Sequence, residues 1–140
     1  MWMIYAFVSA LFAGLTAIFA KIGLKGVDST LATTVRSFIM AGFLFFSAVA
    51  LKKFQPFSLN SFSSKEWLFV VLSGIAGALS WLFYFYALKN GDTTVVSAID
   101  RLSIVFVLIF AGFILGEGFT AYKIAGVLLI ALGAFLTTLK

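Results

Sequence analysis

Three ionisable side chains lie inside long apolar stretches of this sequence. Arg36 lies within residues 31–51, and Asp100 and Arg101 lie within residues 95–115. Placing such a side chain in a membrane-spanning helix costs about 2.5–3.5 kcal/mol on insertion scales, so each one needs a partner or a water-filled cavity. These residues are therefore the first candidates for substrate binding or gating.

Arg36 and Asp100 lie at similar predicted depths. Each is about six residues from the same side of the membrane, which places both roughly 9 Å deep at a rise of 1.5 Å per residue. We predict an ion pair between them, whereas Arg101 is turned about 100° around its helix and faces another neighbour or snorkels outward. One interpretation is a polar mouth that binds a charged or zwitterionic solute, with proton coupling through Asp100. The other is a structural clamp between two helices.

Lys21 completes this candidate group, because it closes the first apolar stretch on the same side of the membrane. The excess of cationic over acidic side chains in the group favours an anionic group on the substrate. The alternative is that Lys21 and Arg101 only snorkel to lipid phosphates.

Other chemistries are excluded by residue type. The chain has no cysteine and no histidine, which excludes thiol and imidazole metal sites and Ser–His or Cys–His nucleophile pairs. No paired carboxylates or phosphate-binding loop are visible, so we expect no enzyme, no catalytic residue, no cofactor and no metal. The net charge is +5, but most basic residues stand at the ends of apolar stretches. That placement is typical of membrane anchoring, so we expect no nucleic-acid partner.

The composition indicates which elements must position these residues. Hydrophobic residues make up 63% of the chain and charged residues 11%, and the mean hydropathy is +1.16. A soluble domain has about 25% charged residues, and a chain of 140 residues cannot hide so much apolar surface in one core. Crossing a bilayer takes about 20 apolar residues. We predict an all-α integral membrane protein with one five-helix transmembrane domain over residues 1–140, its helices at residues 2–20, 31–51, 67–88, 95–115 and 122–139.

Local signals mark some of the helix ends. Ser63 and Glu66 have the spacing of a capping box just before the third helix, although so short a pattern also arises by chance. Asn90 and Gly91 form a dipeptide typical of turns, between the third and fourth helices.

Two further sets of residues share helix faces. Small residues that allow close helix packing recur at Ala6, Ala10 and Gly14, at Gly112 and Gly116, and at Gly126 and Gly133. On the third helix, residues spaced three and four apart are Ser73, Gly77, Ser80, Trp81 and Tyr84. We interpret this second set as one wall of a substrate cavity, because Trp and Tyr combine an apolar ring with a hydrogen-bond donor. The alternative is ordinary packing with lipid-facing aromatic rings.

The flanking lysines are balanced between the two sides of the membrane. The side of the N-terminus carries Lys52, Lys53, Lys65 and Lys123, and the other side carries Lys21, Lys25, Lys89 and Lys140. The positive-inside bias that normally orients a membrane protein is therefore nearly absent. We predict insertion in both orientations and an antiparallel homodimer. The alternative is a fixed topology with the C-terminal side in the cytoplasm, if Arg36 and Arg101 add to the bias.

Several segments also carry a family resemblance. They are residues 14–26 (GLTAIFAKIGLKG), 31–36 (LATTVR), 97–105 (SAIDRLSIV), 114–117 (ILGE) and the glycine-bearing stretch 126–133. Together they resemble the bacterial/archaeal transporter family, a single-repeat branch of the drug/metabolite transporter superfamily with EamA-type domains. Ala98 stands where the family pattern leads us to expect a proline. The resemblance implies a small-metabolite transporter in which two five-helix units make the working carrier.

From these observations we expect a secondary transporter in the inner (plasma) membrane of a prokaryote. It would export a small polar or amphipathic metabolite and work as a homodimer of inverted units. The alternatives are a subunit of a lipid-linked-sugar flippase and a membrane scaffold or accessory subunit that transports nothing.

Overall fold

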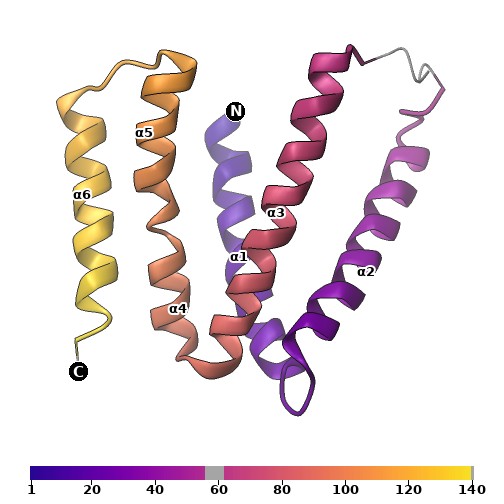
Figure 1. Cartoon of the computed structure of the whole chain (residues 1–140), viewed down its shortest axis with the longest axis horizontal. Coiled ribbons are helices and arrows are strands. Elements are labelled where there is room, and N and C mark those ends of the chain that lie inside the picture. Colours follow the sequence, from indigo (N-terminus) through magenta and orange to yellow (C-terminus); the bar gives the residue numbers. More distant parts are fainter. Residues whose placement is uncertain (56–61, 140) are drawn as a thin grey trace. The chain divides into compact units, whose positions relative to one another are not determined.

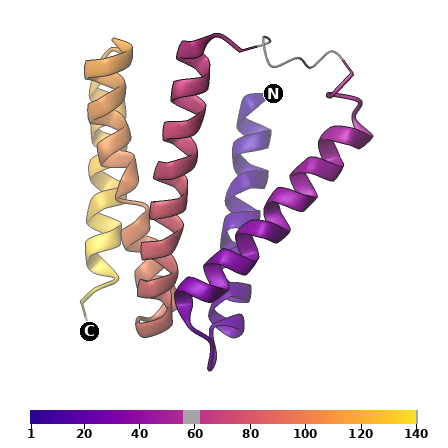
Figure 2. The same cartoon turned by 45° about the vertical axis from the view of Figure 1, so that its right-hand side comes forward.

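The computed structural model describes residues 1–55 and 62–139, and within these ranges the regular structure is entirely α-helical. The helices follow one another along the chain (Figures 1 and 2). They are α1 (Trp2–Gly23), α2 (Ser29–Ala50), α3 (Ser64–Asn90), α4 (Thr93–Asp100), α5 (Ser103–Leu115) and α6 (Ala121–Leu136). The predicted all-α class is confirmed.

Four stretches are long and apolar enough to cross a membrane: α1, α2, α3 and the run Thr93–Leu115 that contains α4 and α5. These match four of the five predicted spans, with ends shifted by a few residues. The fifth, α6, is apolar but has 16 residues, which correspond to about 24 Å. Backbone hydrogen bonds from Thr137, Thr138 and Leu139 continue its last turn and bring it closer to the roughly 30 Å of a hydrocarbon core.

Several of these helices begin at a residue whose side chain caps the first turn. Asp28, Asp92 and Thr120 are the N-caps of α2, α4 and α6, and each accepts a hydrogen bond from a backbone N–H in the first turn. The predicted capping box is confirmed, because the Ser63 N–H donates to Glu66 Oε2 at 2.7 Å and the Glu66 N–H donates to Ser63 Oγ at 3.3 Å. The helix starts are thus determined locally.

The fourth predicted helix is interrupted, which corrects the expectation of one continuous helix over residues 95–115. Its helical hydrogen bonding gives way to turns at Arg101 and Leu102. There the N–H groups of Leu102, Ile104 and Val105 donate to the carbonyl three residues earlier, as in a 3₁₀-helix. Asp100 and Ser103 flank the turn, and both residue types compete with helical bonding through their own side chains. No proline is needed for this break.

By contacts the chain divides into two compact units. One comprises Met1–Lys21 with Asn90–Lys140, and the other comprises Ile22–Lys89. In the first, α6 packs against both α4 and α5. In the second, the start of α2 and the end of α3 lie near each other, and the two helices diverge towards the end of α2 and the start of α3 (Figures 1 and 2). That all 140 residues act as one transmembrane domain stays a prediction.

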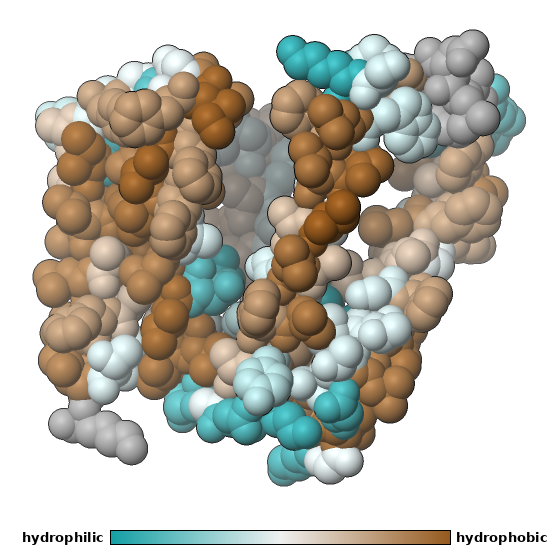
Figure 3. Space-filling view, viewed as in Figure 1, coloured by the Kyte–Doolittle hydropathy of each residue, from teal (hydrophilic) through white to brown (hydrophobic). Residues whose placement is uncertain are grey.

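Apolar side chains cover the outside of the helices (Figure 3). Phe7 is 83% exposed and Phe113 82%. Among the described residues, Leu88 is the one large side chain that is fully buried. Such a surface is unstable in water and stable in hydrocarbon, where helices satisfy their own backbone hydrogen bonds. The protein is therefore a multi-pass membrane protein.

Candidate functional site

A charged side chain stacks on an aromatic ring inside the unit made by residues 22–89. The guanidinium carbon of Arg36 on α2 lies over the indole of Trp81 on α3, 3.8 Å from the ring centroid. The same carbon lies 5.3 Å from the centroid of Phe85. Both distances are within the range of cation–π attraction, which reaches about 2 kcal/mol when the pair is shielded from water. Arg36 and Trp81 were each predicted as site residues, but their contact was not predicted.

Trp81 belongs to a small aromatic cluster that holds its ring. Tyr84 meets it edge-on with centroids 5.5 Å apart, and Phe85 does so at 5.8 Å. These residues follow Trp81 by three and four positions, so they lie on the same face of α3. Phe85 is buried and Trp81 is half-buried. The indole therefore has a supported side, while Arg36 covers part of its face.

On α2, the hydroxyl groups on either side of Arg36 bond to their own helix. Ser29 and Thr33 are buried, and the Thr33 hydroxyl donates to the Ser29 carbonyl at 2.7 Å. The Ser37 hydroxyl donates to the Thr33 carbonyl at 2.8 Å. Small hydroxyl side chains that bond to their own helix leave no buried donor free. Arg36, three residues beyond Thr33 on the same face, brings a charge that these hydroxyls do not neutralise.

The carboxylates of this unit are engaged elsewhere. Between residues 22 and 89 the acidic residues are Asp28 and Glu66. Asp28 Oδ1 accepts from the Leu31 N–H at the start of α2, and Glu66 completes the capping box at the start of α3. Within the described residues of this unit, no carboxylate contacts the Arg36 guanidinium. The aromatic ring compensates its charge but accepts no conventional hydrogen bond.

The other predicted binding or gating residues lie in the first compact unit, which comprises Met1–Lys21 and Asn90–Lys140. Asp100 is the last residue of α4 and is half-buried, and Arg101 is exposed at the interruption of the helix. Because Arg36 and Asp100 belong to different units, their ion pair stays a prediction. Lys21 donates to the Gly91 carbonyl at 2.7 Å and so ties the end of α1 to the turn before α4. That bond gives Lys21 a structural role, and its role in binding stays a prediction.

The predicted cavity wall is brought together in part. Trp81 and Tyr84 touch, whereas Ser73 and Ser80 are exposed and Gly77 is half-buried along the same helix. Whether this face lines a cavity stays a prediction.

The small residues predicted for helix packing fall into two groups. Gly112 lies beneath the ring of Phe119, and Gly116 ends α5 in the left-handed conformation at φ +68°, which favours glycine. The rest are Ala6, Ala10 and Gly14, which are exposed on α1, and Gly126 and Gly133, where an added Cβ would meet nothing within 4 Å. Packing of these faces against another helix stays a prediction.

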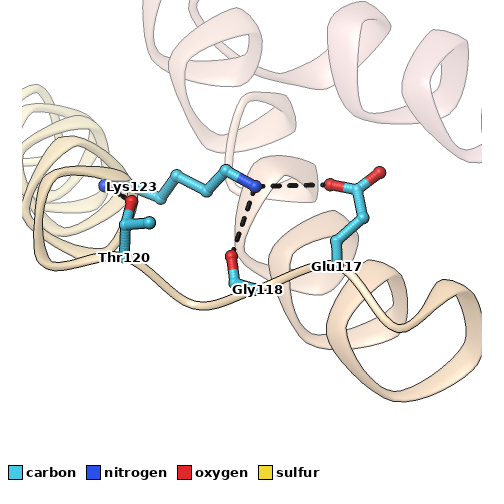
Figure 4. A network of polar contacts seen from close by, with 4 residues as sticks. All are labelled: Glu117, Gly118, Thr120 and Lys123. Atoms are coloured by element: carbon cyan, nitrogen blue, oxygen red, sulfur yellow. Dashed lines mark hydrogen bonds and ion pairs between the residues drawn. The ribbon is translucent and has the colours of Figure 1, made fainter.

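A groove between α5 and α6 was not predicted. Its volume is about 330 Å³, and its lining is mostly aliphatic, with Ala111 and Gly126 among the small residues that leave the space. At its end Lys123 Nζ lies 3.5 Å from Glu117 Oε2 and donates to the Gly118 carbonyl at 3.3 Å, while Thr120 caps α6 (Figure 4). From the sequence, Lys123 is only a charge at the membrane flank, because spacing along the chain does not reveal a contact across a turn.

Comparison with known proteins agrees with this architecture. A protein of Sinorhizobium sp. described as an uncharacterized transporter in the cobO 3' region is 42% identical over 135 residues, which cover 96% of this chain and 94% of that protein. No solved structure matches the chain. The EamA-like transporter family matches residues 1–139. Family and relative both indicate a transporter rather than an enzyme. Together with the apolar helices, the match shows that this chain belongs to the EamA-like transporter family.

Proposed function

We propose that the protein is a secondary transporter that exports a small polar or amphipathic metabolite across the plasma membrane of a prokaryote, as a homodimer of inverted units. The observation that carries this proposal is the Arg36 guanidinium stacked on Trp81 between two candidate membrane spans. An ionisable side chain at such a position is a functional-site candidate, because its insertion is costly. Stacking on Trp81 offsets part of that cost and leaves the hydrogen-bonding capacity of Arg36 for a ligand.

The inverted dimer is supported by the arrangement of spans and charges. With α6 as a fifth span beside the four longer ones, the two ends of one copy lie on opposite sides, so an inverted second copy supplies the repeat that many secondary transporters carry in one chain. The flanking lysines are equally divided between the sides, as described above. The exposed small residues of α1 offer a face for close helix contact.

Transport is tested with the full chain in liposomes. Metabolites are first screened for thermal stabilisation of the purified protein, because a ligand bound to the folded state raises its stability by mass action. Hits are then measured by counterflow in proteoliposomes, with Arg36→Ala as the test variant and the exposed flank variant Lys53→Ala as the matched control. We expect counterflow in the parent and in Lys53→Ala and its loss in Arg36→Ala. A scaffold would show no counterflow with any metabolite, and a flippase subunit would respond only to lipid-linked sugars.

Orientation is tested by cysteine labelling, for which this cysteine-free chain has no background. A single cysteine replaces either Lys25 or Lys53, which lie beyond opposite ends of α2. Dual insertion predicts that an impermeant thiol reagent labels about half of each variant from outside intact cells. Full labelling of one variant and none of the other would contradict the inverted arrangement.

A further inference from the structure

We infer that the stacked pair of Arg36 and Trp81 holds the carboxylate of the transported metabolite, so that the substrate class is amphipathic monocarboxylates. This inference rests on the proposed transport function and names the ligand chemistry of the same site. It is carried by the geometry of the stack, by the charges within the unit and by the aromatic surroundings.

The geometry leaves the donors of Arg36 available. A guanidinium carbon 3.8 Å from a ring centroid is close enough for the guanidinium to stack on the face of that ring. Its N–H groups lie in the guanidinium plane and can point past the ring. Two such donors match the two oxygens of a carboxylate, and this bidentate arrangement is among the strongest hydrogen-bonded pairs in proteins.

The charges favour a ligand with one negative charge. Asp28 and Glu66 are bonded at helix starts, so the unit formed by residues 22–89 brings no carboxylate to Arg36 within its described part. A monocarboxylate neutralises the single guanidinium charge. A doubly charged phosphate would leave a surplus negative charge between apolar spans, where desolvation of an unpaired charge is costly.

The surroundings favour an apolar body on the ligand. Trp81 and Tyr84 are half-buried and meet edge-on, and buried Phe85 supports them from the same helix. Aromatic rings fixed in this way offer a rigid apolar surface beside the charge. An amphipathic carboxylate fits both parts of the site, whereas a fully hydrophilic one would use only Arg36.

The test compares three probes with one apolar body: phenylacetate, phenylacetamide and phenethylamine, with inorganic phosphate as a fourth. Each is added at millimolar concentration to the full-length protein in nanodiscs, and the melting temperature is measured. We expect phenylacetate to stabilise the protein and the amide, the amine and phosphate to have no effect. Arg36→Gln should abolish the stabilisation. Arg36→Lys keeps the charge but lacks the two parallel N–H donors of a guanidinium, so it should weaken apparent binding about tenfold. The exposed Lys53→Gln is the matched control and should respond like the parent.

Several results would overturn the inference. They are an absence of stabilisation by phenylacetate, an equal response in Arg36→Lys and the parent, or stabilisation by the amine or by phosphate instead. A fourth contrary result concerns the ligand-free protein. If Arg36→Gln and Asp100→Asn each lower its stability by the same amount, and the double variant loses no more than either, Asp100 is the counter-ion of Arg36. If a cationic or neutral metabolite shows counterflow that survives Arg36→Lys, the transport function stands and only this inference fails. If no metabolite shows counterflow, the proposed function itself fails.

Discussion

Gly112 on α5 should tolerate a methyl group only if the ring of Phe119 moves away. A Cβ at Gly112 would overlap three ring carbons of Phe119, each closer than real side chains approach. Phe119 is 50% exposed and its ring also meets Phe113, with centroids 6.3 Å apart. The ring can therefore swing out, but it loses these contacts when it does.

The expected magnitude follows from two opposing effects of Gly112→Ala. Replacing a glycine inside a helix by alanine stabilises the helix by about 1 kcal/mol. Overpacking the ring of Phe119 costs about 1–3 kcal/mol. The substitution should therefore lower the free energy of unfolding by about 0–2 kcal/mol in the parent. In a Phe119→Ala background the overlap is gone, and the same substitution should raise it by about 1 kcal/mol.

The assay is a double-mutant cycle on the purified protein in bicelles, unfolded by denaturing detergent and followed by circular dichroism. The coupling between the two sites should equal the cost of the overlap, about 1–3 kcal/mol. Gly74→Ala on α3 is the control, because an added Cβ there meets nothing within 4 Å. It should have the same small effect in both backgrounds.

A particular result would refute this reasoning. If Gly112→Ala destabilises the protein equally with and without the ring of Phe119, the close neighbour of Gly112 is another helix or a second copy. That outcome would support the interhelical packing that the spacing of Gly112 and Gly116 predicts. If Gly112→Ala instead raises the free energy of unfolding in the Phe119→Ala background, the close neighbour of Gly112 is Phe119 of the same chain.

Trp81→Leu should cost about 0.5–2 kcal/mol more in the parent than in Arg36→Gln, because only the parent has a cation on the ring; equal losses by the same unfolding assay would contradict the stack. Ser63→Ala should lower the free energy of unfolding by about 1 kcal/mol through loss of the capping box, and an unchanged stability would mean that the box does not persist in lipid. Lys123→Met should change stability by less than about 1 kcal/mol, because the side chains of Lys123 and Glu117 are 49% and 56% exposed, and added salt should shrink the effect. A larger loss would indicate that a partner buries this pair.

Four of the spans could be predicted to within a few residues of their ends because their causes are local. About 20 apolar residues in a row are enough to specify a membrane helix, and a capping box such as Ser63–Glu66 needs only residues three apart. The interruption at Arg101 and Leu102 could not be predicted with the same certainty. Its signals, Asp100 and Ser103, shift helix propensity only weakly and stand inside a strongly apolar run.

The candidate site could be predicted by residue but not by contact. Arg36 stood out because a charge inside an apolar stretch is costly, and Trp81 stood out by its helical spacing from Tyr84. Depth alone suggested Asp100 as the partner of Arg36. The contact between Arg36 and Trp81 could not be predicted, because an uncharged ring does not stand out as the partner of a charge. The contact also depends on how α2 and α3 cross.

Sequence by itself therefore determined an all-helical membrane protein, the positions of four spans to within a few residues, the capping box before α3 and the charged residues that its spans must accommodate. These depend on short stretches of chain and on the solvent that surrounds them. Only the tertiary structure decided that Arg36 stacks on Trp81, that Phe119 covers Gly112 and that Lys123 pairs with Glu117 beside a groove. Each of these contacts depends on the angle and register between two elements, which the periodicity of a single helix does not encode.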